Sequence, residues 1–263
     1  MNDNAPIAST IANEIAEKQP FAAHAEAIGS ALDSAYAIQE AVKDALIASG
    51  ARTALAGFKI AVNTKPQMDH FGIKEPGAAF VFADQRQASP GARPLSAYRQ
   101  FAYEPEICAI MAAPLAPRPG SYGRDEVAAA IARFVPAFEL LDPRGARTME
   151  LPIAVVFAQN VHNDGIVVGG PGLAPDRLDA DALRTVVREN GAVHLDVTGG
   201  RPQDPLDAAT FIINHMTARG HTVEAGMVIL CGAHQPPRVL DDPTRLELDM
   251  GPLGTATFDL AAG

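Results

Sequence analysis

The strongest constraint on the fold is the spacing of apolar residues downstream of residue 54. They occur in short runs separated by Gly, Pro and Asp. Runs of about four to eight apolar residues between turn-forming residues are typical of strands in a folded core. The sequence therefore predicts strands over residues 57–62, 79–83, 106–112, 136–141, 153–158, 165–168, 193–197 and 226–230, with a closing hairpin over 245–250 and 255–260.

Helical patterns precede and interrupt these strands. Apolar residues recur at intervals of three and four over 35–46, where Asp33 and Ser34 can cap a helix and Gly50 can end it. Further helices are predicted over 125–134, over 180–189, and between a capping Asp204 and Gly220. Residues 89–100 are predicted to form a loop. The expected class is α+β, with an N-terminal helical region (1–53) packed on a mixed β domain (54–263).

Composition excludes several classes of protein. The 263 residues contain 21 Lys and Arg against 31 Asp and Glu, a net charge of −10, with no basic run that could bind nucleic acid. No apolar segment approaches the length of a membrane span. The start, Met1–Asn4, lacks the pattern of a signal peptide, and Cys108 and Cys231 lie in apolar runs, as expected for buried free thiols. We expect a cytoplasmic enzyme acting on a small molecule, with no nucleic-acid or membrane partner.

Glu104 and Glu106 are the first candidates for chemistry. Side chains two apart on a strand point to the same face, so both carboxylates project together if this segment is extended. Adjacent carboxylates repel one another unless a cation or proton lies between them, and oxygen-rich sites suit Mg²⁺ or Mn²⁺. The alternative is a pair of solvent-facing glutamates on an edge strand, with which Pro105 is compatible.

Glu139 and Lys59 are charged residues within short apolar runs. Burying Glu139 requires a compensating cation, so it either faces solvent or contacts a metal or basic side chain. Lys59 can extend its amine to the surface, or it can supply a fixed positive charge to a site. The sequence alone leaves both alternatives open.

Taken in order and spacing, these segments resemble one enzyme family. It is the group of 2-hydroxypenta-2,4-dienoate hydratases and 4-oxalocrotonate decarboxylases, within the fumarylacetoacetate hydrolase superfamily. The resemblance runs from about residue 33 to the end. It is carried by residues 35–39, 57–60, 82–84, 104–106, 136–139, 224–230 and 250–254.

The resemblance implies a fold, a metal and a set of roles. The fold would be a helical layer on a mixed β-sheet roll or barrel of the fumarylacetoacetate hydrolase C-terminal-domain type. The family's metal ligands match Glu104, Glu106 and Glu139, with Mg²⁺ or Mn²⁺ as cofactor. Lys59 matches a lysine that contacts substrate. Asp84 matches an aspartate that works with this lysine in hydratases, and it favours hydration over decarboxylation.

Two segments depart from the family pattern where it lines the substrate pocket. Residues 158–164 read Ala-Gln-Asn-Val-His-Asn-Asp, and residues 231–234 read Cys-Gly-Ala-His. If the first segment is extended, Asn160 and His162 share a face and are candidates for substrate binding. His162 and His234 are either loop histidines or groups that bind a distal carboxylate or transfer protons near neutral pH.

The expected function is that of a metal-dependent hydro-lyase in aromatic or related catabolism. Water would add to a 2-hydroxy-2,4-dienoate, whose carboxylate and 2-oxygen bind the metal, to give a 4-hydroxy-2-oxo acid. Lys59 would stabilise the enolate, and Asp84 or a histidine would transfer the proton. The alternatives, in order, are a 4-oxalocrotonate-type decarboxylase, an acylpyruvate-type C–C hydrolase and a non-catalytic partner subunit. We also expect a homo-oligomer and a possible complex with a pathway partner enzyme.

Overall fold

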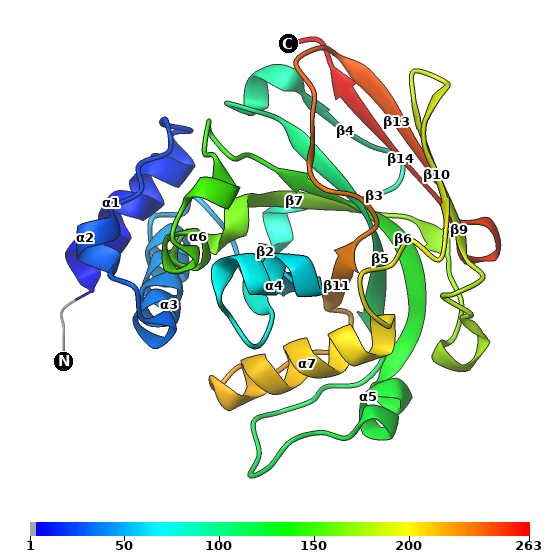
Figure 1. Cartoon of the computed structure of the whole chain (residues 1–263), viewed down its shortest axis with the longest axis horizontal. Helices are drawn as coiled ribbons and strands as arrows, with labels where there is room; N and C mark the ends of the chain where they lie inside the picture. Colours follow the sequence, from blue (N-terminus) through cyan, green and yellow to red (C-terminus); the bar gives the residue numbers. More distant parts are fainter. Residues whose placement is uncertain (1–3) are drawn as a thin grey trace.

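Two mixed β-sheets form the body of the protein, described for residues 4–263 by a computed structural model (Figure 1). The larger sheet has the order β2-β1-β11-β5-β6-β7-β3, with β12 beside β5. Its strands are β1 Leu55–Ala61, β2 Gly77–Phe82, β3 Arg86–Ala88, β5 Ala102–Met111, β6 Ile131–Leu141, β7 Asn163–Val168, β11 Val228–Ala233 and β12 Arg238–Val239.

The smaller sheet has the order β10-β9-β13-β14-β4, with β8 paired to β14. The predicted C-terminal hairpin is confirmed as the antiparallel pair β13 and β14. Neither sheet closes on itself, so the expected roll or barrel is an open one. The strands are β4 Gly91–Pro94, β8 Gly170–Pro171, β9 Arg184–Glu189, β10 Ala192–Thr198, β13 Thr244–Asp249 and β14 Gly254–Ala261.

Helices cover the larger sheet and its ends, which confirms the expected mixture of helices and sheet. The first three form a layer at one side of the molecule (Figure 1), and none of the helices in residues 4–263 is long and apolar enough to cross a membrane. The helices are α1 Ala5–Ala16, α2 Ala25–Ile28, α3 Leu32–Ala48, α4 Lys65–Phe71, α5 Arg124–Ala130, α6 Ile153–Ala158 and α7 Pro205–Ala218.

The helical layer is fixed to the sheet through α3. Its apolar face is buried as the periodicity predicted, with Ile38, Val42 and Leu46 each about 1% exposed. Gln39 lies on the same buried side, and its Nε2 donates to the carbonyls of Ala78 and Phe157. One side chain therefore connects α3 to both β2 and α6.

The expectation that Met1–Asn4 lacks a signal-peptide pattern rests mostly on residues 1–3, which lie outside the described residues.

Two predicted elements were wrong in type. Residues 153–158 form helix α6, not a strand. All six side chains are buried, so the run carries no periodicity that separates helix from strand. Residues 184–189 form strand β9, not a helix, because this segment pairs with β10 through a turn at Asn190 and Gly191. Both turn residues have positive φ, as a two-residue hairpin requires.

Two other predictions had wrong boundaries. The helix expected over 125–134 ends at Ala130, and Ile131 begins strand β6. The loop expected over 89–100 contains β4 and a short 3₁₀ helix, Leu95–Ala97, because Gly91–Pro94 pairs in parallel with the end of β14. Element boundaries depend on these distant pairings, which local sequence does not specify.

One face of the larger sheet determines where chemistry can occur. Along β5, the alternation of side chains places Glu104 and Glu106 on the same face as Cys108 and Ile110. The second half of this face is filled by an apolar cluster: Ala56, Val81, Cys108, Ile110, Val135, Ala137, Ile166, Val228 and Leu230. The half of the face that carries Glu104 and Glu106 borders a cavity instead. The two glutamates therefore lie next to a fully buried apolar cluster.

Candidate active site

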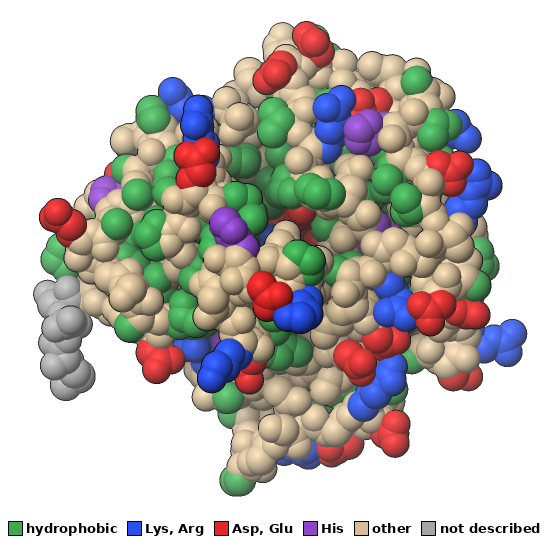
Figure 2. Space-filling view, in the orientation of Figure 1, with side chains coloured by type: hydrophobic (Ala, Val, Ile, Leu, Met, Phe, Trp, Pro, Cys, Tyr) green, Lys and Arg blue, Asp and Glu red, His purple; other side chains and the backbone are tan. Residues whose placement is uncertain are grey.

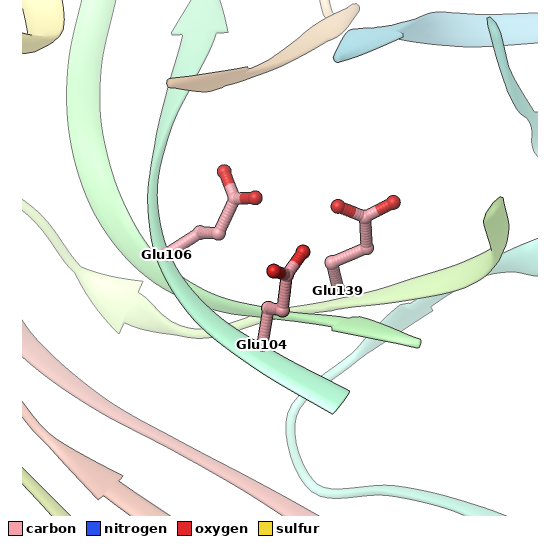
Figure 3. A group of neighbouring side chains, drawn as sticks. All are labelled: Glu104, Glu106 and Glu139. Carbon is pink, nitrogen blue, oxygen red and sulfur yellow. The ribbon is translucent and has the colours of Figure 1, made fainter. Parts of the chain in front are cut away.

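Three glutamates converge on this face, as the sequence predicted. Glu104 on β5 lies directly opposite Glu139 on β6 in the strand register, and Glu106 follows two residues along β5. Each offers a carboxylate oxygen, and the three oxygens lie within 4.8 Å of one another. Figure 3 shows the three carboxylates pointing toward a common centre. We call Glu104, Glu106 and Glu139 the carboxylate cluster.

The alternative of surface glutamates on an edge strand is wrong. Strand β5 lies inside the sheet between β11 and β6, and Glu106 and Glu139 are at most 1% exposed. Pro105 is tolerated because the pairing of β11 with β5 is irregular between Leu230 and Ala233. There the Pro105 carbonyl accepts a hydrogen bond from the backbone N–H of His234 at 2.9 Å.

Specific hydrogen bonds orient two members of the carboxylate cluster. Oε1 of Glu139 accepts from Lys59 Nζ at 2.5 Å and from Asn163 Nδ2 at 2.8 Å. Oε2 of Glu139 is buried and has no partner within residues 4–263. Oε2 of Glu106 accepts from the backbone N–H of Gly232 at 2.8 Å. Each of these two glutamates therefore keeps one oxygen available for another ligand.

Gly232 is required for this arrangement. Its φ of 115° is in the region that favours glycine, and a Cβ there would lie 2.6 Å from Asn63 Nδ2 and 2.7 Å from Pro202 Cγ. A larger residue would displace the backbone N–H that orients Glu106. The Cys-Gly-Ala-His segment thus contributes its glycine backbone to the site as well as a histidine.

The electrostatics of the carboxylate cluster call for a cation. Burial, together with the neighbouring Glu139, raises the pKa of Glu104 to about 8. Burial also raises the pKa of Glu106 well above its usual value, with Glu139 and Glu104 adding to the effect. Burial alone would lower the pKa of Lys59, but Glu139, Glu104 and Glu106 outweigh it and raise the pKa. Lys59 is therefore a fixed positive charge.

These residues fit a hard divalent cation. When all three carboxylates are ionised, they and one ammonium leave two uncompensated negative charges in a region of low dielectric, which a divalent ion would cancel. All the donor atoms are oxygens, which Mg²⁺ and Mn²⁺ prefer over softer metals. The unpartnered Oε2 of Glu139 is the atom that such an ion would satisfy.

A cavity of about 580 Å³ opens above the carboxylate cluster, and its lining includes Lys59, Glu104 and Glu106. Figure 2 shows a hollow near the middle of this face, bordered by hydrophobic side chains, with acidic atoms at its base. The volume lies in the range of small-molecule sites. Metal-binding groups at the base of a largely apolar cavity are suited to a small acid that chelates the metal.

His162 and His234 both line this cavity. His162 Nε2 lies 3.1 Å from Thr148 Oγ1, and His234 Nδ1 lies 2.8 Å from Thr185 Oγ1. The other ring nitrogen of each is buried without a partner within residues 4–263. Burial lowers the pKa of His162 to about 3 and that of His234 to about 4, so both are neutral at pH 7.

Asn160 is placed differently from the expectation. Asn160, Val161 and His162 all have positive φ, between 51° and 60°, so the segment is a left-handed turn and not extended. The amide of Asn160 binds the backbone N–H and C=O of Phe80, at 2.8 and 3.0 Å. It anchors β2 and does not line the cavity. The prediction that Asn160 binds substrate is therefore corrected.

Asp84 also lies outside the cavity. It follows β2 in a short 3₁₀ helix, is exposed, and accepts hydrogen bonds from the backbone N–H and hydroxyl of Thr53, at 2.8 and 3.0 Å. It is absent from the lining of the cavity. The structure does not place Asp84 beside Lys59, because the turn after β2 directs this side chain to the surface. A catalytic role for Asp84 stays a prediction.

Sequence reasoning missed several residues that hold the site together. Asn163 binds Glu139, Gly232 orients Glu106, and Thr148 and Thr185 contact the two histidines. Asn163 had been noted only as a departure from the family pattern. Its position beside a buried strand was a usable signal, since a polar residue there needs a polar partner. The threonines carried no such signal.

Known proteins resemble this chain in sequence and fold, although no protein-family model matches it. The 2-oxo-hept-4-ene-1,7-dioate hydratase of Escherichia coli is 26% identical over 230 residues, which is 85% of each protein. A 4-oxalocrotonate decarboxylase of Pseudomonas sp is 27% identical over 233 residues, covering 86% of this chain and 88% of the relative.

Solved structures with the same fold include a protein of the same name as one of these relatives. The 4-oxalocrotonate decarboxylase from Pseudomonas putida G7, solved with magnesium and adipate, superposes with a TM-score of 0.85 at 21% identity, covering 97% of this chain and 96% of that one. The fold is therefore the one shared by this decarboxylase and by solved proteins described as members of the fumarylacetoacetate hydrolase family. In sequence, the chain is similar to 2-keto-4-pentenoate hydratases and to a 4-oxalocrotonate decarboxylase.

Proposed function

We propose that this protein is a Mg²⁺- or Mn²⁺-dependent hydratase that adds water to a 2-hydroxy-2,4-dienoate and releases a 4-hydroxy-2-oxo acid. The observation that carries the proposal is the convergence of Glu104, Glu106 and Glu139 with Lys59 at the base of an apolar cavity. Relatives that cover most of the chain are named as hydratases of 2-oxo-alkenoates. A place in aromatic or related catabolism is part of this proposal.

The reaction has two steps that balance in atoms. First, the 2-hydroxyl loses its proton as C5 gains one, which converts the dienol to a 2-oxo-3-enoate. Water then adds across C3=C4, with its hydroxyl on C4 and a proton on C3. When bound, the divalent cation supplies Lewis-acid stabilisation of negative charge on the 2-oxygen.

The chain's own residues perform the remaining tasks. The carboxylate cluster fixes the metal, and the hydrogen bonds from Lys59 and Asn163 fix Glu139. The positive charge of Lys59 favours an enolate nearby. With Asp84 outside the cavity, His162 and His234 are the neutral acid–base groups that line it. A neutral imidazole has one donor and one acceptor nitrogen, so it can accept a proton from water and return it to carbon.

A decarboxylase is the second candidate, because a relative named for that activity is 27% identical. Asp84 no longer favours hydration, since the structure places it at the surface. The same cation and Lys59 can stabilise the enolate formed when carbon dioxide leaves.

Product mass tests the proposal. The purified chain with Mg²⁺ or Mn²⁺ is given 2-hydroxydienoates, a 4-oxalocrotonate-type acid and an acylpyruvate. We expect a product that is heavier than its substrate by one water molecule. Loss of carbon dioxide identifies a decarboxylase, and cleavage to two acids identifies a hydrolase. Binding of 2-oxo acids without any turnover identifies a non-catalytic partner subunit.

The expected homo-oligomer, cytoplasmic location and complex with a pathway partner enzyme belong to this proposal. They accord with an enzyme that acts on small diffusible acids. Light scattering coupled to size-exclusion chromatography gives the mass of the assembly, and a monomer under assay conditions removes the homo-oligomer from the proposal.

A further inference from the structure

The cavity is larger than a five-carbon substrate requires. Such an acid has about eight non-hydrogen atoms and, at roughly the 30 Å³ that a water molecule occupies in the liquid, needs about 240 Å³. The cavity is about 580 Å³. With the acid head at the carboxylate cluster, more than half of this volume remains for the distal end of the substrate.

The walls around this remaining volume are mainly apolar. Most of them come from three segments that are far apart in the sequence: the end of β1 with α4, the connection from β6 to α6, and the connection from β11 to β12. Gly200 and Pro202, between β10 and α7, add to the lining. Two of these residues are unusually exposed for large apolar side chains, Met149 at 49% and Val239 at 37%. The apolar lining residues in the three segments include Val62, Phe71, Pro143, Met149, Pro236 and Val239.

The residues that line the cavity offer no unpaired positive charge to a second carboxylate. Among the residues of the described range 4–263 that line the cavity, Lys59 is the only Lys or Arg, and it is paired with Glu139. The two histidines are neutral at pH 7 because burial lowers their pKa values to about 3 and about 4. Two arginines lie near the cavity without lining it. The guanidinium of Arg144 binds Gln159 and the carbonyl of Gln19, and Arg201, between the lining residues Gly200 and Pro202, pairs with Asp181 at 2.6 Å. A distal carboxylate would lose its hydration without gaining an unpaired cation from the lining.

We infer that the substrate is a monocarboxylate, a 2-hydroxy-2,4-dienoate whose carbon chain continues beyond C5 as an apolar alkyl or aryl group. This inference rests on the proposed function for the placement of the carboxylate and 2-oxygen. It distinguishes this chain from relatives that are named for dicarboxylates, such as 2-oxo-hept-4-ene-1,7-dioate hydratase.

Equilibrium binding of stable 2-oxo acids tests the inference separately from turnover. The probes are 2-oxopentanoate, 2-oxooctanoate, 4-phenyl-2-oxobutanoate and 2-oxooctanedioate, titrated calorimetrically into the Mn²⁺-loaded protein. Burying a methylene group strengthens binding about fourfold, so the eight-carbon monoacid should bind at least about tenfold more tightly than the five-carbon acid. The eight-carbon diacid should bind at least about tenfold more weakly than the monoacid of equal length.

A pair of variants locates the effect in the cavity. Met149→Lys places a cation at the apolar rim and should reduce the preference for the monoacid over the diacid at least threefold. Val193→Lys is the matched control, because Val193 on β10 is 53% exposed and does not line the cavity. It should leave the preference unchanged. Unchanged preference in Met149→Lys, or an equal change in both variants, contradicts the assigned location.

The outcomes separate the two proposals. Equal affinity for five- and eight-carbon monoacids, tighter binding of the diacid, or no binding of any probe overturns the inference. A clear preference for the long monoacid without hydration of the matching dienoate supports the inferred tail pocket and overturns the hydratase proposal. Hydration of the five-carbon dienoate with no gain in kcat/KM for 6-alkyl or 6-aryl dienoates supports the hydratase and overturns the inference.

Discussion

Lys59 Nζ lies 2.5 Å from Oε1 of Glu139, while Oε2 of the same carboxylate has no partner within residues 4–263. One oxygen is thus neutralised by the protein, and the other is left for an external cation. Both side chains are almost completely buried, at 3% and 0% exposure. Lys59 therefore stabilises the folded chain as well as acting in the proposed reaction.

We expect Lys59→Met to lower the free energy of unfolding in EDTA by about 3 kcal/mol, because it leaves buried carboxylates without their cation. Urea denaturation measures this. Lys65→Met is the matched control: Lys65 pairs with Asp69 at 2.7 Å, but both are largely exposed, so its loss should cost less than about 1 kcal/mol. If both substitutions lower the free energy of unfolding by the same amount, the buried Lys59–Glu139 pair stabilises the fold no more than an exposed pair does.

Glu106→Gln tests the metal-ligand assignment. The substitution keeps the shape of the side chain and an oxygen that can accept the hydrogen bond from Gly232, so the fold should persist. It removes one negative charge from the carboxylate cluster, and we expect affinity for Mn²⁺ to fall at least about 100-fold, with activity lost in parallel. Calorimetric titration measures the affinity, and Glu150→Gln is the control, because Glu150 is exposed at the end of the short 3₁₀ helix Thr148–Glu150 and does not line the cavity. Unchanged affinity in Glu106→Gln would falsify the assignment.

The stability of the metal-free chain should depend on pH in a particular direction. The pKa of Glu104 is raised to about 8 in the folded state, and that of Glu106 is also raised, so the folded state favours their protonated forms. Their unfavourable contribution is absent below about pH 4.5 and grows as the pH rises toward 8. Metal binding needs the deprotonated forms and releases protons. The difference in melting temperature between Mn²⁺-loaded and EDTA-treated protein should therefore increase from about pH 5 to about pH 8.

Thermal unfolding over this pH series measures the effect. In Glu106→Gln, the difference in melting temperature should depend less on pH. A difference that is constant or that decreases with pH would mean that the carboxylate cluster is ionised without metal. Calorimetric titration in two buffers of different ionisation enthalpy gives an independent check, since proton release appears as a buffer-dependent heat.

The carboxylate cluster was predictable from sequence for a local reason. Strand alternation alone places Glu104 and Glu106 together, and the resemblance supplied Glu139. The left-handed turn at Asn160–His162 was not predictable, because three successive non-glycine residues with positive φ occur only where surrounding packing holds them there. The same limit explains the error at 153–158. A fully buried apolar run takes its conformation from its neighbours, and local pattern does not reveal them.

Asp84 provides a direct test of the corrected site. The sequence resemblance predicts that its loss suppresses hydration, whereas the structure places it at the surface against Thr53. We expect Asp84→Leu to keep kcat/KM within about twofold of the parent and to lower stability by about 1 kcal/mol through the lost hydrogen bonds. A fall in kcat of about 100-fold or more, with metal affinity intact, would restore the catalytic role of Asp84.

His162 and His234 are the remaining candidates for proton transfer, since each lines the cavity with one unpartnered ring nitrogen. We expect at least one of His162→Gln and His234→Gln to lower kcat by about 10²–10⁴, the usual contribution of a positioned acid–base group. KM and Mn²⁺ affinity should change little, because neither ring contacts the carboxylate cluster through a hydrogen bond.

His70→Gln is the control, since His70 is an exposed histidine on α4 that binds the Met149 carbonyl. Steady-state kinetics with a matched dienoate separates kcat from KM. If both variants retain the parental kcat, water reaches the substrate without a histidine. The proton must then pass through Lys59 or solvent.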